Sequence, residues 1–368
     1  MASRPRRTRN LTRTVLAVLC VAAVTGVAAC GTAPKSDADK PKDVAGTIGG
    51  SLDSLVAAAK KEGTLTLYSG DAQDTLNIEA AEFKSKYGID VKIVRALTDP
   101  LDARIASEYK SGVHNADVYQ AGSTEPFLAQ NKDYFLPLSA SNVPGWDDYP
   151  AAARQQNSYV YLRENPTVIQ YNTTLVPKDK VPTSWQDLLD PFWKGHLQLT
   201  DLTSSGSYMQ WAEIMKQQYG ISYLQKLKAQ GLKIAASGTA AAQDIAAGSA
   251  YADFPGRIVH SVTLRKEKAP IAYQVMPGSG VPIFAAVFAK APHPYASLLF
   301  VDYLMSVEGQ KDMCAKVEGT LSFYNIDGKS PDQQIEGCLP PEKGWQLNPF
   351  NVTDESERNA LLTAIGQK

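Results

Sequence analysis

The sequence predicts an α/β protein built from two lobes, and two observations carry this prediction. Segments with the patterns of strands and helices alternate along most of the chain after Gly50. Strands that alternate with helices form a parallel sheet with helices on its faces. About 315 of the 368 residues follow Gly50, and because single hydrophobic cores stop growing at roughly 250–300 residues, we expect two lobes.

Residues 64–68, TLTLY, have the pattern of the first strand. The helix predicted next carries apolar residues at spacings of four, three and four positions, which places them on one helical face: Leu76, Ala80, Phe83 and Tyr87. Gly88 is expected to end this helix, because glycine is common directly after a helix C-terminus. A strand at 89–94, a helix stopped by Gly112 and a strand at 116–121 continue the alternation.

The middle of the chain repeats this alternation. Residues 183–195 are predicted to form a helix that begins with a capping box of Thr183 and Gln186. The elements expected after it are a strand at 196–201, helices at 204–219 and 223–231, a strand at 232–237, a helix at 238–248, a strand at 249–254, a helix at about 256–268 and strands at 271–276 and 281–289. A helix at 293–305 has Pro292 near its first turn, and another helix follows Ser306 as N-cap.

The N-terminus has the features of a secretory signal peptide. Five arginines and no acidic residue precede an uncharged run from Val15 to Ala29, which is short for a bilayer-spanning helix of about 20 residues. Ala28 and Ala29 before Cys30 resemble the lipobox of bacterial lipoproteins, in which the cysteine becomes the lipidated first residue. Residues 1–29 are therefore expected to be a lipoprotein signal peptide; a plain signal peptide with an incidental cysteine is the alternative.

Residues 30–50 are polar and rich in Pro and Gly, so we expect a disordered tether between the lipid and the folded part. Without residues 1–29 the chain has 32 basic and 38 acidic side chains, which gives no sign of a nucleic-acid partner. Only Cys314 and Cys338 remain in the folded part, and outside the cytoplasm they are most simply a disulfide. No CxxC or Cys/His cluster points to zinc, and no cofactor is expected.

Six segments resemble the extracellular solute-binding proteins of ABC importers: KKEGTLTLYSG, FKSKYGIDV, NADVYQAGS, YNTTLVPKDKVPTSWQDLLDPFWKGHLQLTD, SGTAAAQDIAAGSA and APHPYASLLFVDYLMSVEGQ. They occur in the order of that family from about Leu52 to about Val317. The most similar branch contains ferric-iron binding proteins and carriers of phosphorylated or phosphonate ligands. The resemblance implies a type II periplasmic-binding-protein fold, in which two parallel-type sheets are joined by two crossing strands and the lobes close on a ligand.

Under this resemblance, residues 51–166 form the first part of lobe 1, residues 167–280 form lobe 2, and residues 281–368 form the second part of lobe 1 and a C-terminal tail. The crossing strands are expected near residues 167–173 and 281–289. The resemblance also implies a role: a monomeric receptor that is no enzyme, anchored by its lipid to the outer face of the bacterial cell membrane, delivers a small anionic solute to an ABC permease.

Ligands of open parallel sheets bind beyond the carboxyl ends of the strands. In such places the sequence has four groups of small polar residues, most of which precede helices: Ser69-Gly70-Asp71, Gly122-Ser123-Thr124, Thr203-Ser204-Ser205-Gly206 and Ser237-Gly238-Thr239. Hydroxyl groups and free backbone N–H groups at helix starts bind anions, so these groups are predicted to face the ligand. Ser, Thr and Gly also cap helices that bind nothing, and this alternative remains open.

The segment DFPGRIVHSVTLRK, residues 253–266, bears on the class of ligand. In the iron-binding members of the family, the corresponding helix start carries two adjacent tyrosines, and these positions fall here on His260 and Ser261 or one residue to either side. No tyrosine lies between Ala252 and Lys266. The positions of a histidine and a glutamate of those members are occupied by Ala72 and Gly122. The resemblance therefore implies a phosphorylated, phosphonate or carboxylate ligand, with ferric iron as the alternative and with no metal ligand among the residues named.

Three residues of this segment are further candidates for ligand contact. Arg257 is expected in the first turn of a helix, where a cation is unfavourable unless an anion lies nearby, and a guanidinium binds carboxylate or phosphate bidentately. A salt bridge from Arg257 to Asp253 without any ligand role is the alternative. Asp253 could also pair with a ligand ammonium, and His260 is as readily a packing or capping residue.

Four tyrosines are candidates for the walls of the cleft, although core packing explains each equally well: Tyr68, Tyr119, Tyr171 and Tyr273. A turn predicted at residues 277–282 is another candidate wall. No GxSxG, HExxH or P-loop motif occurs. SEYK at 107–110 matches the SxxK of penicillin-binding enzymes, but KTG and SDN are absent, so chance is the better account. A scaffold lipoprotein without an importer is the remaining alternative.

Overall fold

The computed structural model describes residues 51–122, 124–154, 158–326, 335, 337–339 and 354–368. The predicted signal peptide, the tether and the lipidation residue Cys30 lie outside these residues, as does Ser123. No helix of the described part combines the length and the apolar character that crossing a membrane requires.

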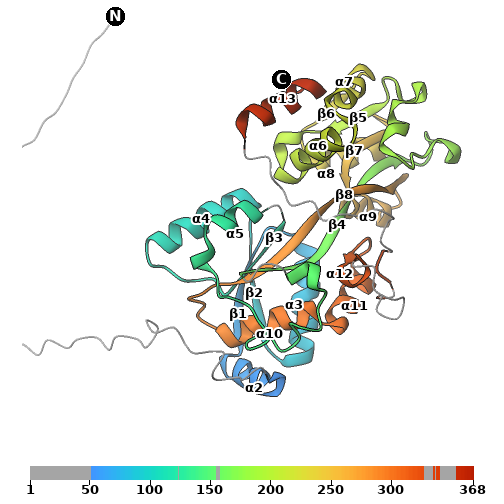
Figure 1. Cartoon of the computed structure of the whole chain (residues 1–368). Coiled ribbons are helices and arrows are strands. Elements are labelled where there is room, and N and C mark those ends of the chain that lie inside the picture. Colours follow the sequence, from blue (N-terminus) through green and yellow to red (C-terminus); the bar gives the residue numbers. More distant parts are fainter. Residues whose placement is uncertain (1–50, 123, 155–157, 327–334, 336, 340–353) are drawn as a thin grey trace, which may run out of the picture. The chain divides into compact units, whose positions relative to one another are not determined.

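One mixed sheet runs through the protein, with its strands in the order β2-β1-β3-β8-β4-β7-β5-β6 and with β9 beside β4. The strands are β1 Thr64–Ser69, β2 Asp90–Arg95, β3 Val118–Gly122, β4 Val160–Asn172, β5 Leu197–Thr200, β6 Lys233–Ala235, β7 Ala252–Arg257, β8 Ile271–Val287 and β9 Leu321–Ser322. Strand β1 pairs in parallel with β2 and β3, and β5 pairs in parallel with β6 and β7. The long antiparallel strands β4 and β8 join these two groups (Figure 1), which confirms the predicted α/β fold with two crossing strands.

Helices flank both groups of strands: α2 Leu52–Glu62, α3 Gln73–Tyr87, α4 Thr98–Lys110, α5 Glu125–Gln130, α6 Gly206–Tyr219, α7 Ile221–Ala229, α8 Gly238–Ala246, α9 Ile258–Lys266, α10 Pro294–Met305, α11 Val307–Lys316, α12 Phe323–Ile326 and α13 Glu355–Ile365. Side-chain caps start several of them, since Ser51, Ser306 and Asp354 accept backbone N–H groups of the first turn. Gly88 ends α3 in the left-handed conformation, as predicted. Pro294 occupies the first turn of α10, two residues after Pro292.

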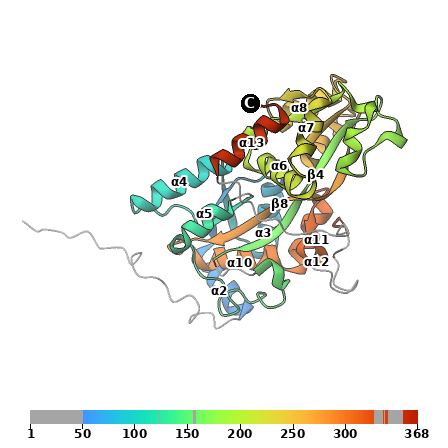
Figure 2. The ribbon, with the colours of Figure 1, turned by 45° about the horizontal axis from the view of Figure 1, so that its top comes forward.

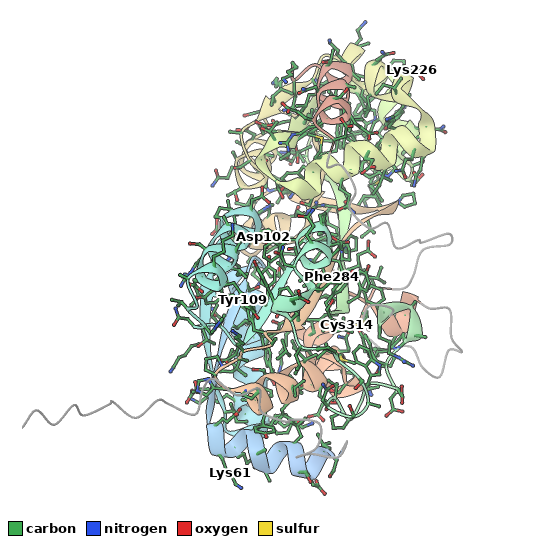
Figure 3. The ribbon with its side chains drawn as sticks, turned by 60° about the vertical axis from the view of Figure 1, so that its left-hand side comes forward. Lys61, Asp102, Tyr109, Lys226, Phe284 and Cys314 are labelled. Carbon is green, nitrogen blue, oxygen red and sulfur yellow. A yellow bond between two sulfur atoms is a disulfide. The ribbon has the colours of Figure 1, made fainter. Side chains whose placement is uncertain are left out.

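Two large hydrophobic cores define two lobes, and a third, smaller cluster contains Ile245 of α8 and Ile271 of β8. Lobe 1 contains β1, β2, β3, α2, α3, α4, α10 and α11, and Phe83 and Phe300 pack in its core at 5.0 Å between ring centroids. Phe284 of β8 lies among the same side chains (Figure 3). Lobe 2 contains β5, β6, β7, α6, α7, α8 and α9, and its core contains Trp185, Trp211 and Leu361.

The C-terminal helix α13 belongs to the core of lobe 2. Leu361, Leu362 and Ile365 are buried there, and Lys216 of α6 forms an ion pair with Glu357. Figures 1 and 2 both show α13 beside α7. The prediction from the sequence instead placed residues 281–368 in the second part of lobe 1 and a C-terminal tail.

Residues 183–195 differ from the predicted helix. They form two 3₁₀ segments, at 185–189 and 191–193. The capping box consists of Ser184 and Asp187, and it does not involve Gln186. The carboxylate Oδ2 of Asp187 accepts the backbone N–H groups of Thr183 at 2.8 Å and of Ser184 at 2.9 Å. An α-helix cannot continue through Pro191, because proline has no N–H to donate and its ring clashes with the preceding turn.

Residues 277–282 are not a turn. The two strands predicted on either side of them form the single strand β8. Pro166 of β4 pairs with Gly280, whereas Val168 pairs with Val275. Extra residues of β8 therefore bulge opposite Thr167, and a bulge absorbs an insertion without ending the strand. Gly278 supplies the left-handed backbone that this bulge contains, with φ of 69°.

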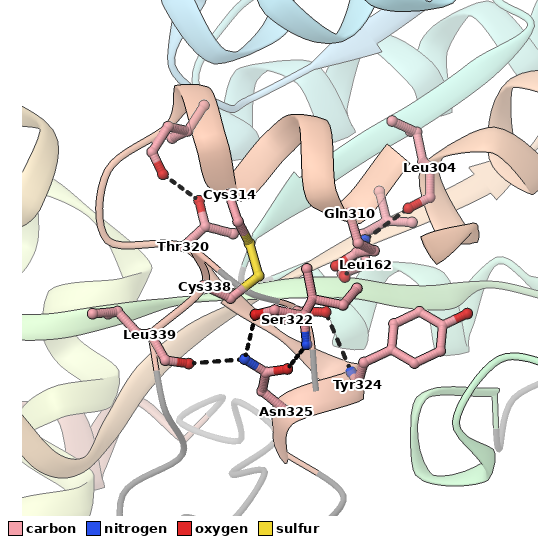
Figure 4. Close-up of a disulfide and its surroundings, with 12 residues drawn as sticks. Leu162, Leu304, Gln310, Cys314, Thr320, Ser322, Tyr324, Asn325, Cys338 and Leu339 are labelled. Carbon is pink, nitrogen blue, oxygen red and sulfur yellow. Dashed lines mark hydrogen bonds between the residues drawn. A yellow bond between two sulfur atoms is a disulfide. The ribbon is translucent and has the colours of Figure 1, made fainter. Parts of the chain in front are cut away.

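The predicted disulfide between Cys314 and Cys338 is present, with a Cα–Cα distance of 4.8 Å (Figure 4). It joins α11 to the segment 337–339. Beside it, the N–H of Leu339 donates to the carbonyl of Thr320 at 2.9 Å. On the chain-entropy account, closing a loop of this length stabilises the fold by roughly 3 kcal/mol.

Candidate ligand-binding site

A cavity of about 310 Å³ is lined by both lobes. Lobe 1 contributes the starts of α3 and α4, and lobe 2 contributes the starts of α6 and α9. Strands β4 and β8 and the segment 317–320 complete the lining. The volume is at the lower end of the range for small-molecule sites, about 300–1,000 Å³, so the cavity suits a small solute.

The starts of α3 and α4 present uncapped backbone N–H groups. The N-cap residues Ala72 and Leu97 provide no side-chain hydrogen bond to the first turns. The first N–H groups of a helix have no partner within the helix, and the helix dipole makes this end electropositive. Thr98 Oγ1 donates to the carbonyl of Gly122 at 3.3 Å, which ties the start of α4 to the end of β3. Both helix starts thus favour a negative group in the cavity.

Two glycines bring strand ends close to the cavity wall. A Cβ atom on Gly70 would lie 2.8 Å from Thr98 Oγ1, and one on Gly122 would lie 2.7 Å from Val281 Cγ1. A larger residue at either position would displace the neighbouring side chain or backbone. Both glycines therefore have a packing role as well as a place in the lining.

The start of α6 is built from serines. Ser205 is its N-cap, and its Oγ accepts the N–H of Ser207 at 3.4 Å. Ser204 lines the cavity too, and its hydroxyl donates to the carbonyl of Asp201 at 2.6 Å. Thr203 lies outside the lining, and its N–H and hydroxyl both donate to Asp201 Oδ1 at 2.8 Å.

Arg257 is the N-cap of α9 and the last residue of β7, and it does not lie in the first turn of the helix as predicted. Strand β7 continues through Gly256, so the helix begins two residues later than expected. The Nη1 of Arg257 donates to Thr167 Oγ1 at 3.0 Å, and the guanidinium carbon lies 4.9 Å from the ring centroid of Tyr208. Its Nη2 is buried and has no hydrogen-bond partner among the described residues.

Asp253 does not neutralise Arg257. Its carboxylate is fully buried and accepts the hydroxyl of Thr200 at 3.1 Å, and burial raises the pKa of Asp253 to about 8. In the described part of the chain, no carboxylate forms an ion pair with Arg257. The salt bridge considered as the alternative is therefore absent, and Asp253 lies outside the cavity lining.

His260 lines the cavity beside Tyr208 and Gly238. A Cβ atom on Gly238 would overlap with the Tyr208 hydroxyl and lie 2.8 Å from His260 Nε2. Burial, together with the charge of Arg257, lowers the pKa of His260 to about 4. The imidazole is therefore neutral at pH 7, so it offers a hydrogen bond to a ligand and no charge.

Asp71 lines the cavity, and the guanidinium of Arg163 neutralises its carboxylate. Arg163 forms ion pairs with both Asp71 and Glu79, the latter at 2.6 Å, and Gln120 Nε2 donates to Glu79 at 3.0 Å. Ser69 is buried, and its Oγ accepts the N–H of Asp71 at 3.1 Å. Because Arg163 balances it, Asp71 repels an anion in the cavity less than a free carboxylate would.

The ion pairs of Arg163 with Asp71 and Glu79 explain why the buried residues of α3 differ from the predicted ones. Glu79 is buried at 1% exposure, whereas the neighbouring Ala80 is only half-buried. Burial raises the pKa of Glu79, and the adjacent Arg163 opposes that shift. Helical periodicity identifies apolar positions, and it cannot identify a charged residue that is buried beside a distant partner.

Arg95 is a lining residue that the sequence did not indicate. The predicted strand stopped one residue before it, whereas β2 ends at Arg95. Its Nε donates to the backbone carbonyl of Asp71 at 2.6 Å, and its side chain is exposed. Arg95 directly follows the predicted strand at 89–94, and a basic residue in that position is the signal that could have identified it as a lining residue.

The segment 317–320 is the second feature that sequence reasoning missed. Glu318 lines the cavity, accepts the hydroxyl of Tyr273 at 2.7 Å and forms an ion pair with Arg265 of α9. Gly319 packs directly against Ile258. This part of the chain therefore connects lobe 1 to the helix that follows Arg257.

The predicted ligand residues fall into three groups. Those that line the cavity are Gly70, Asp71, Gly122, Ser204, Ser205, Arg257 and His260. Those placed elsewhere are Ser69, Thr203, Ser237, Gly238, Thr239 and Asp253, and Ser123 lies outside the described residues. The four tyrosines proposed as walls, Tyr68, Tyr119, Tyr171 and Tyr273, are not in the lining.

A metal site of ordinary side-chain ligands is not formed by the described residues. No group of three or more His, Cys, Asp or Glu residues among them could hold a metal ion. The described lining also contains no tyrosine.

Comparison with known proteins places this architecture in a family. Residues 80–323 match the model of the family described as bacterial extracellular solute-binding protein. An uncharacterised protein of Haemophilus influenzae is 23% identical over 268 residues, which cover 69% of this chain and 76% of that protein.

Three solved structures share the fold. Iron-bound HitA from Pseudomonas aeruginosa is 24% identical, with a TM-score of 0.63, over 82% of this chain and 99% of that chain. AfuA from Actinobacillus pleuropneumoniae, with fructose-6-phosphate bound, is 20% identical with a TM-score of 0.58, over 83% and 97%. The Trichodesmium protein IdiA (FutA), with iron and citrate, is 19% identical with a TM-score of 0.64, over 83% and 100%.

At these identities the structural matches establish the fold, that of type II periplasmic binding proteins, and the family model establishes membership. Its match covers more than half of the chain and includes the starts of α4, α6 and α9 at the cavity. This chain belongs to the bacterial extracellular solute-binding proteins, the extracytoplasmic receptors of ABC importers.

Proposed function

We propose that this protein captures a small organic anion between its two lobes and delivers it to an ABC permease. The observation that carries the proposal is Arg257, which lines the cavity and whose buried Nη2 has no hydrogen-bond partner among the described residues. A buried charge without a counter-charge is costly. A phosphate, phosphonate or carboxylate group would supply that counter-charge and bind bidentately.

The surroundings of Arg257 favour the same ligand class. The uncapped starts of α3 and α4 face the cavity from lobe 1, and helix starts bind anions. Arg95 adds a second cation to the lining. Of the three carboxylates in the lining, Asp71 pairs with Arg163 and Glu318 pairs with Arg265, whereas Asp99 lies in the first turn of α4, where the helix dipole stabilises it. AfuA, which has this fold, binds a phosphorylated sugar.

Attachment to the cell is part of the proposal. Cys30 would carry the lipid, residues 30–50 would link it to the folded part, and the protein would act as a monomer on the outer face of the membrane. No enzymatic step is proposed, since the family consists of solute-binding transport proteins.

Ferric iron is the second candidate ligand, because HitA and the Trichodesmium protein, which share the fold, bind iron. Oxygen ligands suit this hard cation, and three carboxylates line the cavity: Asp71, Asp99 and Glu318. Two of them are already engaged, Asp71 by Arg163 and Glu318 by Arg265. Iron would therefore need an accompanying anion, as in the iron and citrate complex of the Trichodesmium protein.

A melting-temperature screen of the purified protein tests the proposal. The panel contains phosphate esters, phosphonates, dicarboxylates, polyamines and chelated ferric iron. A ligand at 100 times its Kd adds about 2.7 kcal/mol, which raises the Tm by a few degrees. We expect an anion to raise the Tm of the wild type and of Arg358→Gln, an exposed control, but not of Arg257→Gln. A response to iron alone would support the second candidate, and no response to any compound would contradict both.

A further inference from the structure

From the apolar part of the cavity lining we infer that the solute is amphiphilic: a small anion that carries a short aliphatic group. This inference rests on the proposed function and narrows it to one class of anion. The observations that carry it are two exposed aliphatic side chains, one from each lobe, that line the cavity. Leu97 precedes α4 and is 63% exposed, and Val259 of α9 is 41% exposed.

The position of these two residues distinguishes them from ordinary surface residues. Leu97 is the most exposed large apolar residue in the described part of the chain. Exposed aliphatic groups cost free energy in water, and they are usually isolated or belong to a binding surface. Leu97 and Val259 reach the same cavity from different lobes, so a solute that binds there with an aliphatic group would cover both.

Each lobe also pairs an aliphatic residue with an arginine. In lobe 1, Leu97 follows Arg95 by two residues, and in lobe 2, Ile258 and Val259 follow Arg257 directly. All five residues line the cavity. The lining therefore offers a cation and an adjacent apolar surface on both sides, which matches an anionic head group with an attached hydrocarbon part.

Buried aliphatic residues extend this surface along β8. Val281 is 6% exposed and Ile283 is 3% exposed, and both lie against Gly122, where a Cβ atom would be 2.7 Å and 3.1 Å from their side-chain carbons. Ile258 packs in the same way against Gly319. Glycine has no side chain, so at Gly122 and at Gly319 the branched side chains meet only backbone.

Other classes of anion fit this lining less well. A bare inorganic anion would leave Leu97 and Val259 in water. A sugar phosphate would place part of its polar ring against Leu97 and Val259, whose side chains offer its hydroxyl groups no hydrogen bond. The described lining has no aromatic ring other than His260 on which a sugar could stack. The cavity volume of about 310 Å³ limits the hydrocarbon part to a short one.

Calorimetric titration of the purified protein with n-alkylphosphonates, from methyl to pentyl, tests the inference. Glycerol 3-phosphate serves as the hydroxylated comparison. We expect the affinity to rise about threefold to fourfold for each added methylene until the cavity is filled. The same series of n-alkyl carboxylates establishes whether the trend depends on the head group.

The double variant Leu97→Ala, Val259→Ala should flatten this dependence on chain length, and alanine adds no capping hydroxyl at the start of α4. The matched control is Ile234→Ala on β6, which replaces an aliphatic residue that is 47% exposed and lies outside the cavity. We expect the control to keep the full dependence. A flattened series in the double variant alone would support the inference.

The outcomes separate this inference from the proposed function. If anions bind in a manner that requires Arg257 but their affinity does not depend on chain length, the inference is wrong and the proposed function stands. Tighter binding of glycerol 3-phosphate than of butylphosphonate would also show that the inference is wrong and that the proposed function stands. If neither n-alkyl series binds but another anion of the melting-temperature panel does, only the inference is wrong; if no anion of any class binds, both are wrong.

Discussion

Two arginines of this protein, Arg163 behind the cavity wall and Arg257 in the lining itself, have opposite surroundings. Arg163 on β4 lies behind the wall and forms ion pairs with Asp71 and Glu79. Arg257 at the end of β7 reaches the cavity itself, and its described neighbours are a hydroxyl, a carbonyl and an aromatic ring. A buried charge whose partners are all present holds the fold together, whereas a buried charge without a counter-charge can accept one from a ligand.

The largest effect is expected from Arg163→Met. The substitution would leave Asp71 and Glu79 without their counter-charge, and breaking a buried pair in this way costs about 3–5 kcal/mol. Urea unfolding followed by circular dichroism measures the loss. The triple variant Arg163→Met, Asp71→Asn, Glu79→Gln should recover much of it, because no charge is then left unpaired. A loss below about 1 kcal/mol for Arg163→Met would mean that the network contributes little.

Arg257→Gln should act on binding and spare the fold. Removal of a charge-assisted bidentate contact costs about 1.5–3 kcal/mol per hydrogen bond, so the affinity for an anion should fall at least tenfold. The free energy of unfolding should stay the same or increase, since the substitution removes a buried cation that has no counter-charge. Calorimetric titration and urea unfolding of one preparation measure the two quantities. If the variant unfolds more easily and binds the anion normally, Arg257 stabilises the fold and does not bind the ligand.

His260 makes the stability of this region pH-dependent, because its burial and, to a lesser extent, the charge of Arg257 lower the pKa of the imidazole. The folded-state pKa of about 4 lies below the ordinary value of 6.5, so between these values the unfolded state binds more protons. The stability of the folded protein should therefore fall as the pH drops from 6.5 to 4, by roughly 1–2 kcal/mol for this partly exposed group. Unfolding measured at pH 7 and pH 5 should show a smaller difference in His260→Gln. An unchanged difference would assign the pH effect to other groups.

The smallest effect is expected at Arg265, whose partner is at the surface. Its ion pair with Glu318 joins α9 to the segment 317–320, and both side chains are more than 40% exposed. Exposed ion pairs contribute about 0–1 kcal/mol, so Glu318→Gln should change the free energy of unfolding by less than about 1 kcal/mol. Urea unfolding at low and at high salt measures this. A larger loss would mean that this contact limits the movement of α9.

The contrast between the two arginines also shows what sequence patterns can and cannot predict. Arg257 was identified because local features surround it: a strand, a Pro-Gly pair and the start of a helix. Arg163 was missed because its partner Glu79 lies 84 residues away along the chain, and no periodicity within one element reveals such a pair. Arg95 was missed because the predicted strand ended one residue too early.

The fold itself was largely predictable from local patterns. Alternation identified strands such as β1 and β5, and helix ends such as Gly88 followed from backbone preferences. Strand β8 was divided in two because Pro277 and Gly278 are typical of turns, and only pairing with β4 holds the bulged strand together. The packing of α13 in lobe 2 depends on tertiary contacts that its own sequence does not specify.

The position of α13 has a consequence for biosynthesis. Leu361, Leu362 and Ile365 complete the core of lobe 2, although the sheet and other helices of that lobe are formed by residues up to about 287. A chain that emerges from its N-terminus can assemble those earlier elements, yet the core keeps an uncovered apolar face until residue 365 has been released. Lobe 2 can therefore reach its final packing only after Ile365 has been synthesised, and until then its exposed apolar face favours aggregation.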